Sequence, residues 1–116
     1  MKKYLKIEYG SRGEMEVLGL VESSKDEIQK ELDLIIEGCE DGEEEYYEEF
    51  MFIGEDVEKG VIEVCVSEEE SYTYYDYELN KEVVDEVLRI DSLCKEEKMS
   101  WSEGDELVDK LLSKLL

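Results

Sequence analysis

Residues 2–21 read KKYLKIEYGSRGEMEVLGLV and alternate between apolar and polar side chains. In the first half, Leu5, Ile7 and Tyr9 fall on one face and charged side chains on the other, which is typical of a half-buried β-strand. The glycine-bounded segment 10–13 favours a turn, and a second alternating segment follows it. Residues 2–21 therefore predict a β-hairpin.

A helix is predicted next along the chain. Ser24, Lys25, Asp26 and Glu27 form a capping-box pattern, in which the first and last side chains satisfy free backbone amides. The apolar residues beyond it recur at helical spacing. They are Ile28, Leu32, Ile35, Ile36 and Cys39. We expect a helix over roughly Lys25 to Glu37, ended by Gly38.

The middle of the chain predicts a three-strand meander. Tyr46–Met51 fits a helical stripe, whereas Phe50–Ile53 fits a buried strand, and we favour a strand over the latter part. Gly54–Gly60 is a turn candidate. Val61–Ser67 is rich in β-branched residues, and Ser71–Leu79 alternates tyrosines between two faces, so each predicts a further strand.

Two helices are predicted at the C-terminal end. Asn80 can cap a helix that runs to about Lys98, and Ser102 can cap a final helix. The final helix carries an apolar stripe that suits packing on the chain's own core or, alternatively, a dimer seam. The stripe is Leu107, Val108, Leu111, Leu112, Leu115 and Leu116.

These elements predict an α+β fold in a single domain over residues 1–116, with the order β-β-α-β-β-β-α-α. Hairpins and meanders favour a mainly antiparallel sheet, here a hairpin plus a three-strand meander, with the helices on one face. The 41% hydrophobic content supports a folded domain despite the charge.

The formal net charge of −22 is concentrated in the middle of the chain. Residues 37–78 hold seventeen carboxylates and one lysine, a formal charge of −16, whereas residues 1–36 carry −2 and residues 79–116 carry −4. Charge concentrated in this way repels itself and weakens the compact state. It suits a surface that binds a basic partner, and strongly basic surfaces are typical of proteins that bind nucleic acid. Adaptation to high salt is an alternative, although it usually spreads acidic residues over the whole chain.

Several classes of function are disfavoured. The chain has no histidine, so the usual general base is absent. A nucleophilic cysteine would also lack the basic partner that activates it. We therefore expect that the protein is not an enzyme. Asp41-Gly42 matches a calcium loop too poorly for a dedicated metal site, and we expect no cofactor. Repulsion disfavours direct binding of nucleic acid or of anionic membranes. Three widely spaced cysteines and the absence of a signal-like N-terminus predict a reduced, cytoplasmic protein.

The candidate partner-binding residues are the carboxylates of the acidic middle and its tyrosines, which offer rings for cation–π contact with arginine. Acidic rims at residues 43–45 and 68–70 are expected at one end of the sheet, and a rim at residues 55–58 at the opposite turn. The full set is Glu40, Asp41, Glu43, Glu44, Glu45, Glu48, Glu49, Glu55, Asp56, Glu58, Glu68, Glu69, Glu70, Tyr72, Tyr74, Asp76 and Glu78.

In size, acidity and its Glu/Tyr-rich segment 40–78, the chain resembles the small acidic phage-type inhibitors that mimic DNA, including anti-CRISPR proteins. The resemblance implies occlusion of the basic groove of a CRISPR effector or nuclease, in the cytoplasm of a host bacterium if a phage encodes the chain, by a monomer or a homodimer. Two alternatives stay open: an immunity protein that neutralises a basic nuclease toxin, and an acidic chaperone or adaptor for a basic client.

Overall fold

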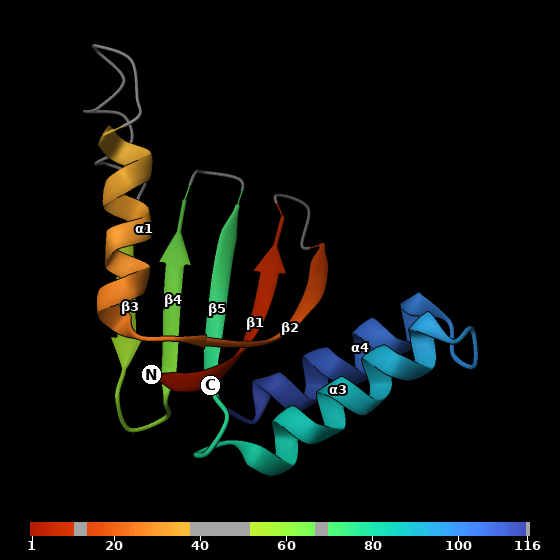
Figure 1. Cartoon of the computed structure of the whole chain (residues 1–116). Helices are drawn as coiled ribbons and strands as arrows, with labels where there is room; N and C mark the ends of the chain where they lie inside the picture. Colours follow the sequence, from red (N-terminus) through yellow and green to blue (C-terminus); the bar gives the residue numbers. More distant parts are fainter. Residues whose placement is uncertain (11–13, 38–51, 67–69, 116) are drawn as a thin grey trace.

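The computed structural model of the chain describes residues 1–10, 14–37, 52–66 and 70–115. These residues form a five-stranded antiparallel sheet and three helices in the order β-β-α-β-β-β-α-α (Figure 1). The α+β fold class predicted from the sequence is therefore confirmed.

The sheet consists of the hairpin and the meander joined edge to edge. Its spatial order is β2-β1-β5-β4-β3, and each neighbouring pair is antiparallel. The first strand of the hairpin pairs with the last strand of the meander, so residues about seventy positions apart lie side by side. The strands are β1 (Lys2–Tyr9), β2 (Met15–Ser23), β3 (Phe52–Asp56), β4 (Val61–Cys65) and β5 (Ser71–Asp76).

Both faces of the central strands are apolar. On one face Leu5 pairs with Tyr75, and Tyr75 pairs with Val61 on its other side; all three are buried. On the opposite face Ile62 pairs with Tyr74, and both side chains are again buried. A sheet with two apolar faces needs cover on both sides, because neither face tolerates water.

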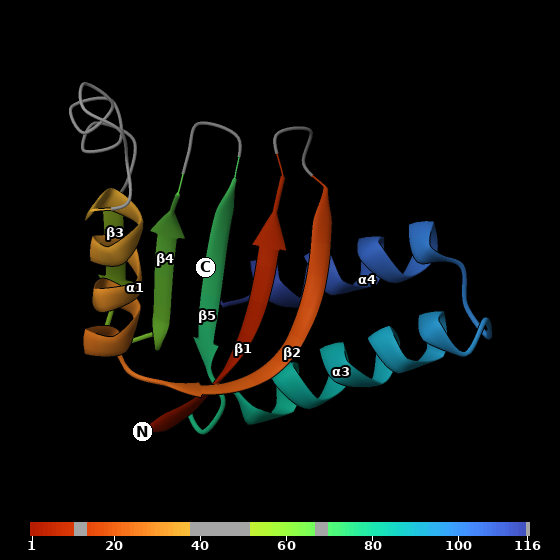
Figure 2. The same cartoon turned by 45° about the horizontal axis from the view of Figure 1, so that its top comes forward.

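The helices accordingly lie on both faces, and the prediction of helices on one face is wrong. Helix α1 (Lys25–Glu37) packs Ile28 and Leu32 on the face that carries Tyr74. Helices α3 (Lys81–Lys95) and α4 (Trp101–Ser113) cover the face that carries Leu5 and Tyr75. Figure 2 shows α4 passing behind β1 and β2, whereas α1 lies in front of β3.

Serine side chains fix the start of two helices. Ser24 Oγ accepts a hydrogen bond from the Glu27 amide at 3.2 Å, as the capping box at α1 predicts. At α4 the cap is Ser100, whose Oγ accepts from the Glu103 amide at 3.3 Å, so the predicted cap at Ser102 is two residues late. Capping at Ser100 brings Trp101 into the first turn of the helix.

Asn80 precedes α3 but does not cap it with its side chain. Its amide nitrogen donates instead to the carbonyl oxygens of Lys59, at 3.0 Å, and of Asp76, at 3.1 Å. The side chain therefore ties the start of α3 to the turn between β3 and β4. The helix ends at Lys95, three residues before the predicted end at Lys98.

The strand predicted over Phe50–Ile53 is displaced along the chain. In the described residues β3 begins at Phe52 and continues through Gly54 to Asp56, which the sequence analysis placed in a turn. Pairing explains the difference, because Gly54 lies opposite Glu63 and Asp56 opposite Val61 in the ladder with β4. The choice between helix and strand for Tyr46–Met51 falls outside the described residues.

The C-terminal stripe packs mainly on the chain's own core. Val108 and Leu112 are buried among α3 and the sheet, with Leu111 and Leu115 partly buried beside them. Leu107 is 37% exposed. The two central residues of the predicted dimer seam are therefore already covered by the same chain, and a homodimer stays a prediction.

Candidate partner-binding surface

About half of the predicted binding residues lie outside the described part of the chain. The structure describes the members near the β3–β4 turn and along β5: Glu55, Asp56, Glu58, Glu70, Tyr72, Tyr74, Asp76 and Glu78. The residues outside it are Glu40, Asp41, Glu43, Glu44, Glu45, Glu48, Glu49, Glu68 and Glu69.

The carboxylates at the β3–β4 turn are partly occupied by contacts within the chain. Glu55 Oε2 lies 2.7 Å from Lys25 Nζ at the start of α1. Asp56 Oδ1 accepts a hydrogen bond from the Lys59 amide at 3.1 Å and so shapes the turn. Glu58 is exposed. Of these three, Glu58 has the side chain most available to a partner.

Tyr74 and Asp76 are buried and have places in the fold. The Tyr74 ring packs edge-on against Tyr4 with 6.1 Å between centroids. Asp76 Oδ1 accepts hydrogen bonds from the amides of Glu78, at 3.0 Å, and Leu79, at 3.2 Å, which closes the turn before α3. Only 4% of Tyr74 and 5% of Asp76 are exposed, so they offer little surface to a partner.

Glu70 and Tyr72 meet two further carboxylates on the sheet. Glu8 on β1 lies directly opposite Tyr72 on β5 and, on its other side, opposite Glu16 on β2. Paired residues of antiparallel strands project from the same face, so these side chains form one surface. The Tyr72 hydroxyl donates to Glu70 Oε1 at 2.6 Å. We call Glu8, Glu16, Glu70 and Tyr72 the open-face cluster.

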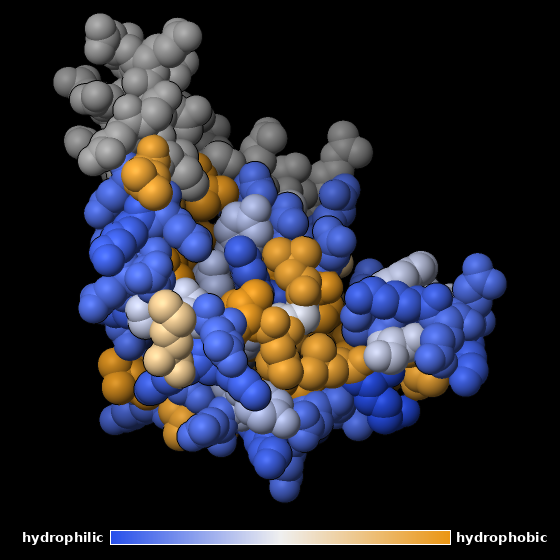
Figure 3. Space-filling model, in the orientation of Figure 1, coloured by the Kyte–Doolittle hydropathy of each residue, from blue (hydrophilic) through white to orange (hydrophobic). Residues whose placement is uncertain are grey.

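The open-face cluster lies beyond the area that α1 covers. Helix α1 stands in front of β3 in Figure 1, and no described helix stands in front of β1 or β2. On the same side of the molecule, Figure 3 shows hydrophilic residues over the ends of β5, β1 and β2 and hydrophobic residues lower on the sheet. The cluster is therefore an acidic area beside an apolar one.

Like charges on adjacent strands give the cluster an electrostatic cost. Partial burial in the sheet, a hydrogen bond with Glu70 and the charges of Glu70 and Glu16 raise the pKa of Glu8 above its ordinary value of 4.5. The hydrogen bond from Tyr72 to Glu70 also raises the pKa of the Tyr72 hydroxyl. Like charges directly opposite each other destabilise a sheet. The folded protein keeps these like charges, although neutral residues at the same positions would not repel one another.

One cation relieves part of the repulsion. Lys6 Nζ lies 4.6 Å from the centroid of the Tyr72 ring and 5.4 Å from that of Tyr74, within the range of cation–π attraction. This contact is an internal example of the recognition expected of a partner. It shows that the tyrosines at the start of β5 present ring faces to a basic side chain.

Glu8 and Glu16 were not among the residues predicted from the acidic middle. The hairpin register places them opposite each other, and this much the sequence alternation indicates. Their proximity to Glu70 depends on the pairing of β1 with β5, for which the sequence carries no local signal. The described surface therefore combines the nearly neutral N-terminal hairpin with the acidic segment.

We expect the thermal stability to increase as the pH is lowered from about 7.5 to about 5. The folded-state pKa of Glu8 is raised above its unfolded value, so protonation favours the folded state and the stabilisation is lost as the pH rises through the folded pKa. Glu8→Gln should raise the midpoint of thermal unfolding at neutral pH and flatten its pH dependence. Glu22→Gln, opposite Lys3 on the same hairpin, is the control and should bring no such gain.

None of the helices in the described part of the chain has the length and apolar composition needed to cross a membrane. Among the described residues, no three Cys, Asp or Glu side chains converge to hold a metal ion. Comparisons of the chain with known protein families, with curated proteins and with solved structures found no match.

Proposed function

We propose that this protein is an acidic inhibitor that mimics nucleic acid and blocks the basic groove of a defence nuclease or a CRISPR effector. The observation that carries the proposal is the segregation of charge, with −16 of the net −22 in residues 37–78. Duplex DNA presents one negative charge per roughly 1.7 Å of its axis, so a mimic needs crowded carboxylates on a frame that holds them.

The open-face cluster is the described part of such a frame. Glu8 and Glu16 project from neighbouring strands of one sheet. Glu70 directly precedes β5, and the hydrogen bond that it accepts from the Tyr72 hydroxyl restricts its carboxylate. Fixed anions lose less conformational entropy on binding than anions on a flexible chain. The tolerated repulsion within the cluster also supports the proposal, because a basic groove would supply the missing counter-charges.

Inhibition by this route is steric and electrostatic. The net charge steers the protein toward a basic groove, and the association rate falls with salt as the field is screened. Tyrosine rings and partly desolvated carboxylates then slow dissociation. No chemical step on the partner is required, and inhibition is stoichiometric.

The test begins with affinity capture of the partner from bacterial lysate at low salt, with elution at high salt. The purified partner is then titrated with fluorescent duplex DNA or guide RNA at several concentrations of this protein. The apparent dissociation constant of the nucleic acid should rise linearly with inhibitor concentration, as in mutually exclusive binding. Polyglutamate at equal total charge is the control and should compete much more weakly, because it lacks the frame.

A ternary complex of inhibitor, partner and nucleic acid would contradict the proposal. So would a captured partner that has no nucleic-acid-binding groove. A secreted or toxin-associated nuclease as the captured partner would instead favour the immunity-protein alternative, which shares the electrostatics and differs in the target.

A further inference from the structure

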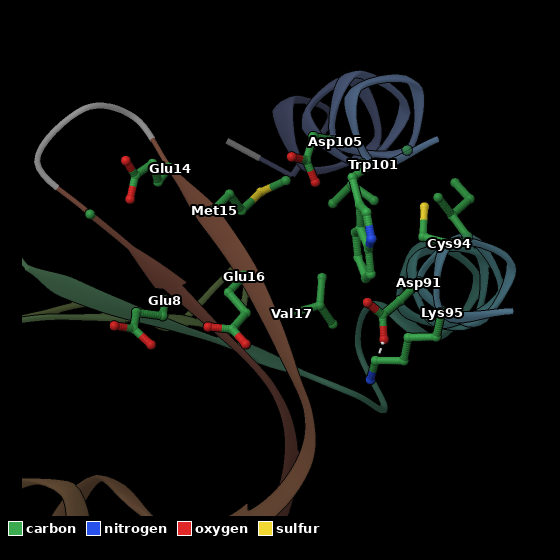
Figure 4. Close-up of a pocket in the computed structure, with 14 residues that line it drawn as sticks. Glu8, Glu14, Met15, Glu16, Val17, Asp91, Cys94, Lys95, Trp101 and Asp105 are labelled. Atoms are coloured by element: carbon green, nitrogen blue, oxygen red, sulfur yellow. Dashed lines mark ion pairs between the residues drawn. The ribbon is translucent and has the colours of Figure 1, made fainter. Parts of the chain in front are cut away.

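A cavity of about 470 Å³ opens between the edge of the sheet at β2 and the helix pair α3 and α4. Its apolar lining comes from three elements: Met15 and Val17 on β2, Ile90 on α3 and Val108 on α4. In Figure 4 Met15 and Val17 project from β2 toward the two helices across the gap. The volume lies within the range of about 300–1,000 Å³ that is usual for ligand sites.

Trp101 forms a wall of the cavity. It is the first residue of α4, so the Ser100 cap fixes its position. In Figure 4 its indole extends from α4 toward Asp91 on α3. The side chain is 54% exposed, although burial of an indole is strongly favourable. An exposed tryptophan at the mouth of an apolar cavity is typical of a residue that a partner covers.

The two helices bring two carboxylates and one lysine to the cavity: Asp91 and Lys95 on α3, and Asp105 on α4. In Figure 4 Glu8, Glu14 and Glu16 project from the hairpin away from the two helices. Lys95 Nζ lies 2.9 Å from Asp91 Oδ2, so the one lysine of the cavity lining is paired with Asp91 and not with Asp105. Burial and the charge of Asp91 raise the pKa of Asp105, so the two carboxylates repel each other across the cavity.

We propose that this cavity binds an arginine side chain of a protein partner. The planar guanidinium fits the face of Trp101 by cation–π contact and stacking, while Asp105 supplies a charge-assisted hydrogen bond. The methylene stem lies over Met15 and Val17. An ammonium group is more strongly hydrated than a guanidinium and stacks less well, so lysine fits less well than arginine.

The inference rests on the proposed function, because a basic groove presents arginines. The side chains of Glu8 and Glu16 project from the opposite face of the sheet to Met15 and Val17, so the open-face cluster and the cavity lie on the two sides of the sheet edge formed by β2 (Figure 4). The cavity adds a specific contact to a surface that otherwise attracts by charge density. It extends the interface around the β2 edge of the sheet onto α4, outside the acidic middle of the sequence.

Trp101 is the only tryptophan in the chain, so its fluorescence reports on the cavity directly. We would titrate the full chain at low salt with N-acetyl-arginine amide and, in parallel, with N-acetyl-citrulline amide, which is nearly isosteric and uncharged. The arginine probe should produce a saturable fluorescence change with an about millimolar dissociation constant, as expected for a ligand of this size. Its methylene protons should shift upfield in NMR spectra through the ring current of the indole. The citrulline probe should bind at least about tenfold more weakly.

A pair of variants separates the cavity from the net charge. Asp105→Asn removes a carboxylate from the lining, whereas Asp109→Asn removes the same charge one turn further along α4, outside the cavity. The first should weaken binding of the arginine probe about three- to fivefold, and the second should leave it nearly unchanged.

Three outcomes would overturn the inference: equal binding of the two probes, equal weakening by the two variants, or the absence of saturable binding in both fluorescence and NMR. None of them bears on competition with nucleic acid, which tests the proposed function separately. Conversely, a ternary complex with nucleic acid would contradict the proposed function and leave a measured arginine site in place.

Discussion

Neutralising the open-face cluster should slow association with the partner about tenfold at low salt. The variant is Glu8→Gln, Glu16→Gln and Glu70→Gln together. It removes three charges from one patch, and local charge governs the final approach of two complementary surfaces. Glutamine keeps the side-chain size and can still accept the hydrogen bond that Tyr72 gives to Glu70. The effect is measured by stopped-flow mixing with the captured partner over a range of salt concentrations.

The matched control carries the same net charge at different places. Glu82→Gln, Glu106→Gln and Asp109→Asn remove three exposed charges from α3 and α4. We expect this control to slow association less than about twofold. Equal slowing by both variants would mean that only the total charge matters and that the cluster is not the docking surface.

Folding is not a confounding factor in this comparison. Removal of these charges should raise the thermal stability of the cluster variant. Partial burial, the hydrogen bond with Glu70 and the neighbouring like charges raise the pKa of Glu8, and a neutral side chain there avoids the cost of burying and crowding a charge. Slower binding by a more stable protein cannot be ascribed to unfolding. A variant that is both less stable and slower would point to an unrecognised structural role for these carboxylates.

The local elements of this fold follow from local patterns. The alternation around Leu5 and Ile7 predicts the hairpin, and the capping box at Ser24 predicts α1, because both signals arise within a few residues. The pairing of β1 with β5 has no such signal. It is decided by which strand edges remain free after the hairpin and meander form, and that is a property of the whole sheet.

A sign of helices on both faces was present in the sequence. Val61 and Ile62 on β4, like Tyr74 and Tyr75 on β5, are adjacent apolar residues, and adjacent residues in a strand point to opposite faces. Successive apolar residues in two neighbouring strands indicate a sheet buried on both sides. The expectation of one covered face came from the topology alone and neglected this pattern.

The candidate site shows the same division between local and long-range information. The acidity of residues 37–78 can be read from composition, but composition does not separate Glu58, which is exposed, from Asp76, which is buried in a turn. The pairing of the strands and the turns between them decide which carboxylate is exposed and which is buried. Trp101 precedes the apolar stripe of the final helix and adds to its apolar surface, but it was not among the predicted binding residues, because its place beside the cavity depends on how closely α3 and α4 approach each other.

That close approach depends on Gly104, and Gly104→Ala should lower the free energy of unfolding by about 2 kcal/mol. A Cβ atom at this position would overlap Cys94 Sγ on α3 and lie 3.5 Å from Ile90 Cγ2. Cys94 is buried and its Sγ lies 3.6 Å from the Ser100 carbonyl oxygen, so a shift of its side chain costs packing and this contact. Overpacking of a core costs about 1–3 kcal/mol and more where the overlap is severe, offset by up to about 1 kcal/mol from the better helix propensity of alanine.

The two residues should show strong coupling. Cys94→Ala removes the overlapping sulfur, so in that background Gly104→Ala should be neutral or stabilising, and a double-mutant cycle measured by urea unfolding should give a coupling of about 2 kcal/mol. Gly54→Ala on β3 is the control, because no atom lies within 4 Å of the added Cβ and the change should stay within about 0.5 kcal/mol. If Gly104→Ala were equally harmless in both backgrounds, α3 and α4 would have to be further apart than they are here. The cavity beside Trp101, whose lining includes Gly104, would then have a different shape as well.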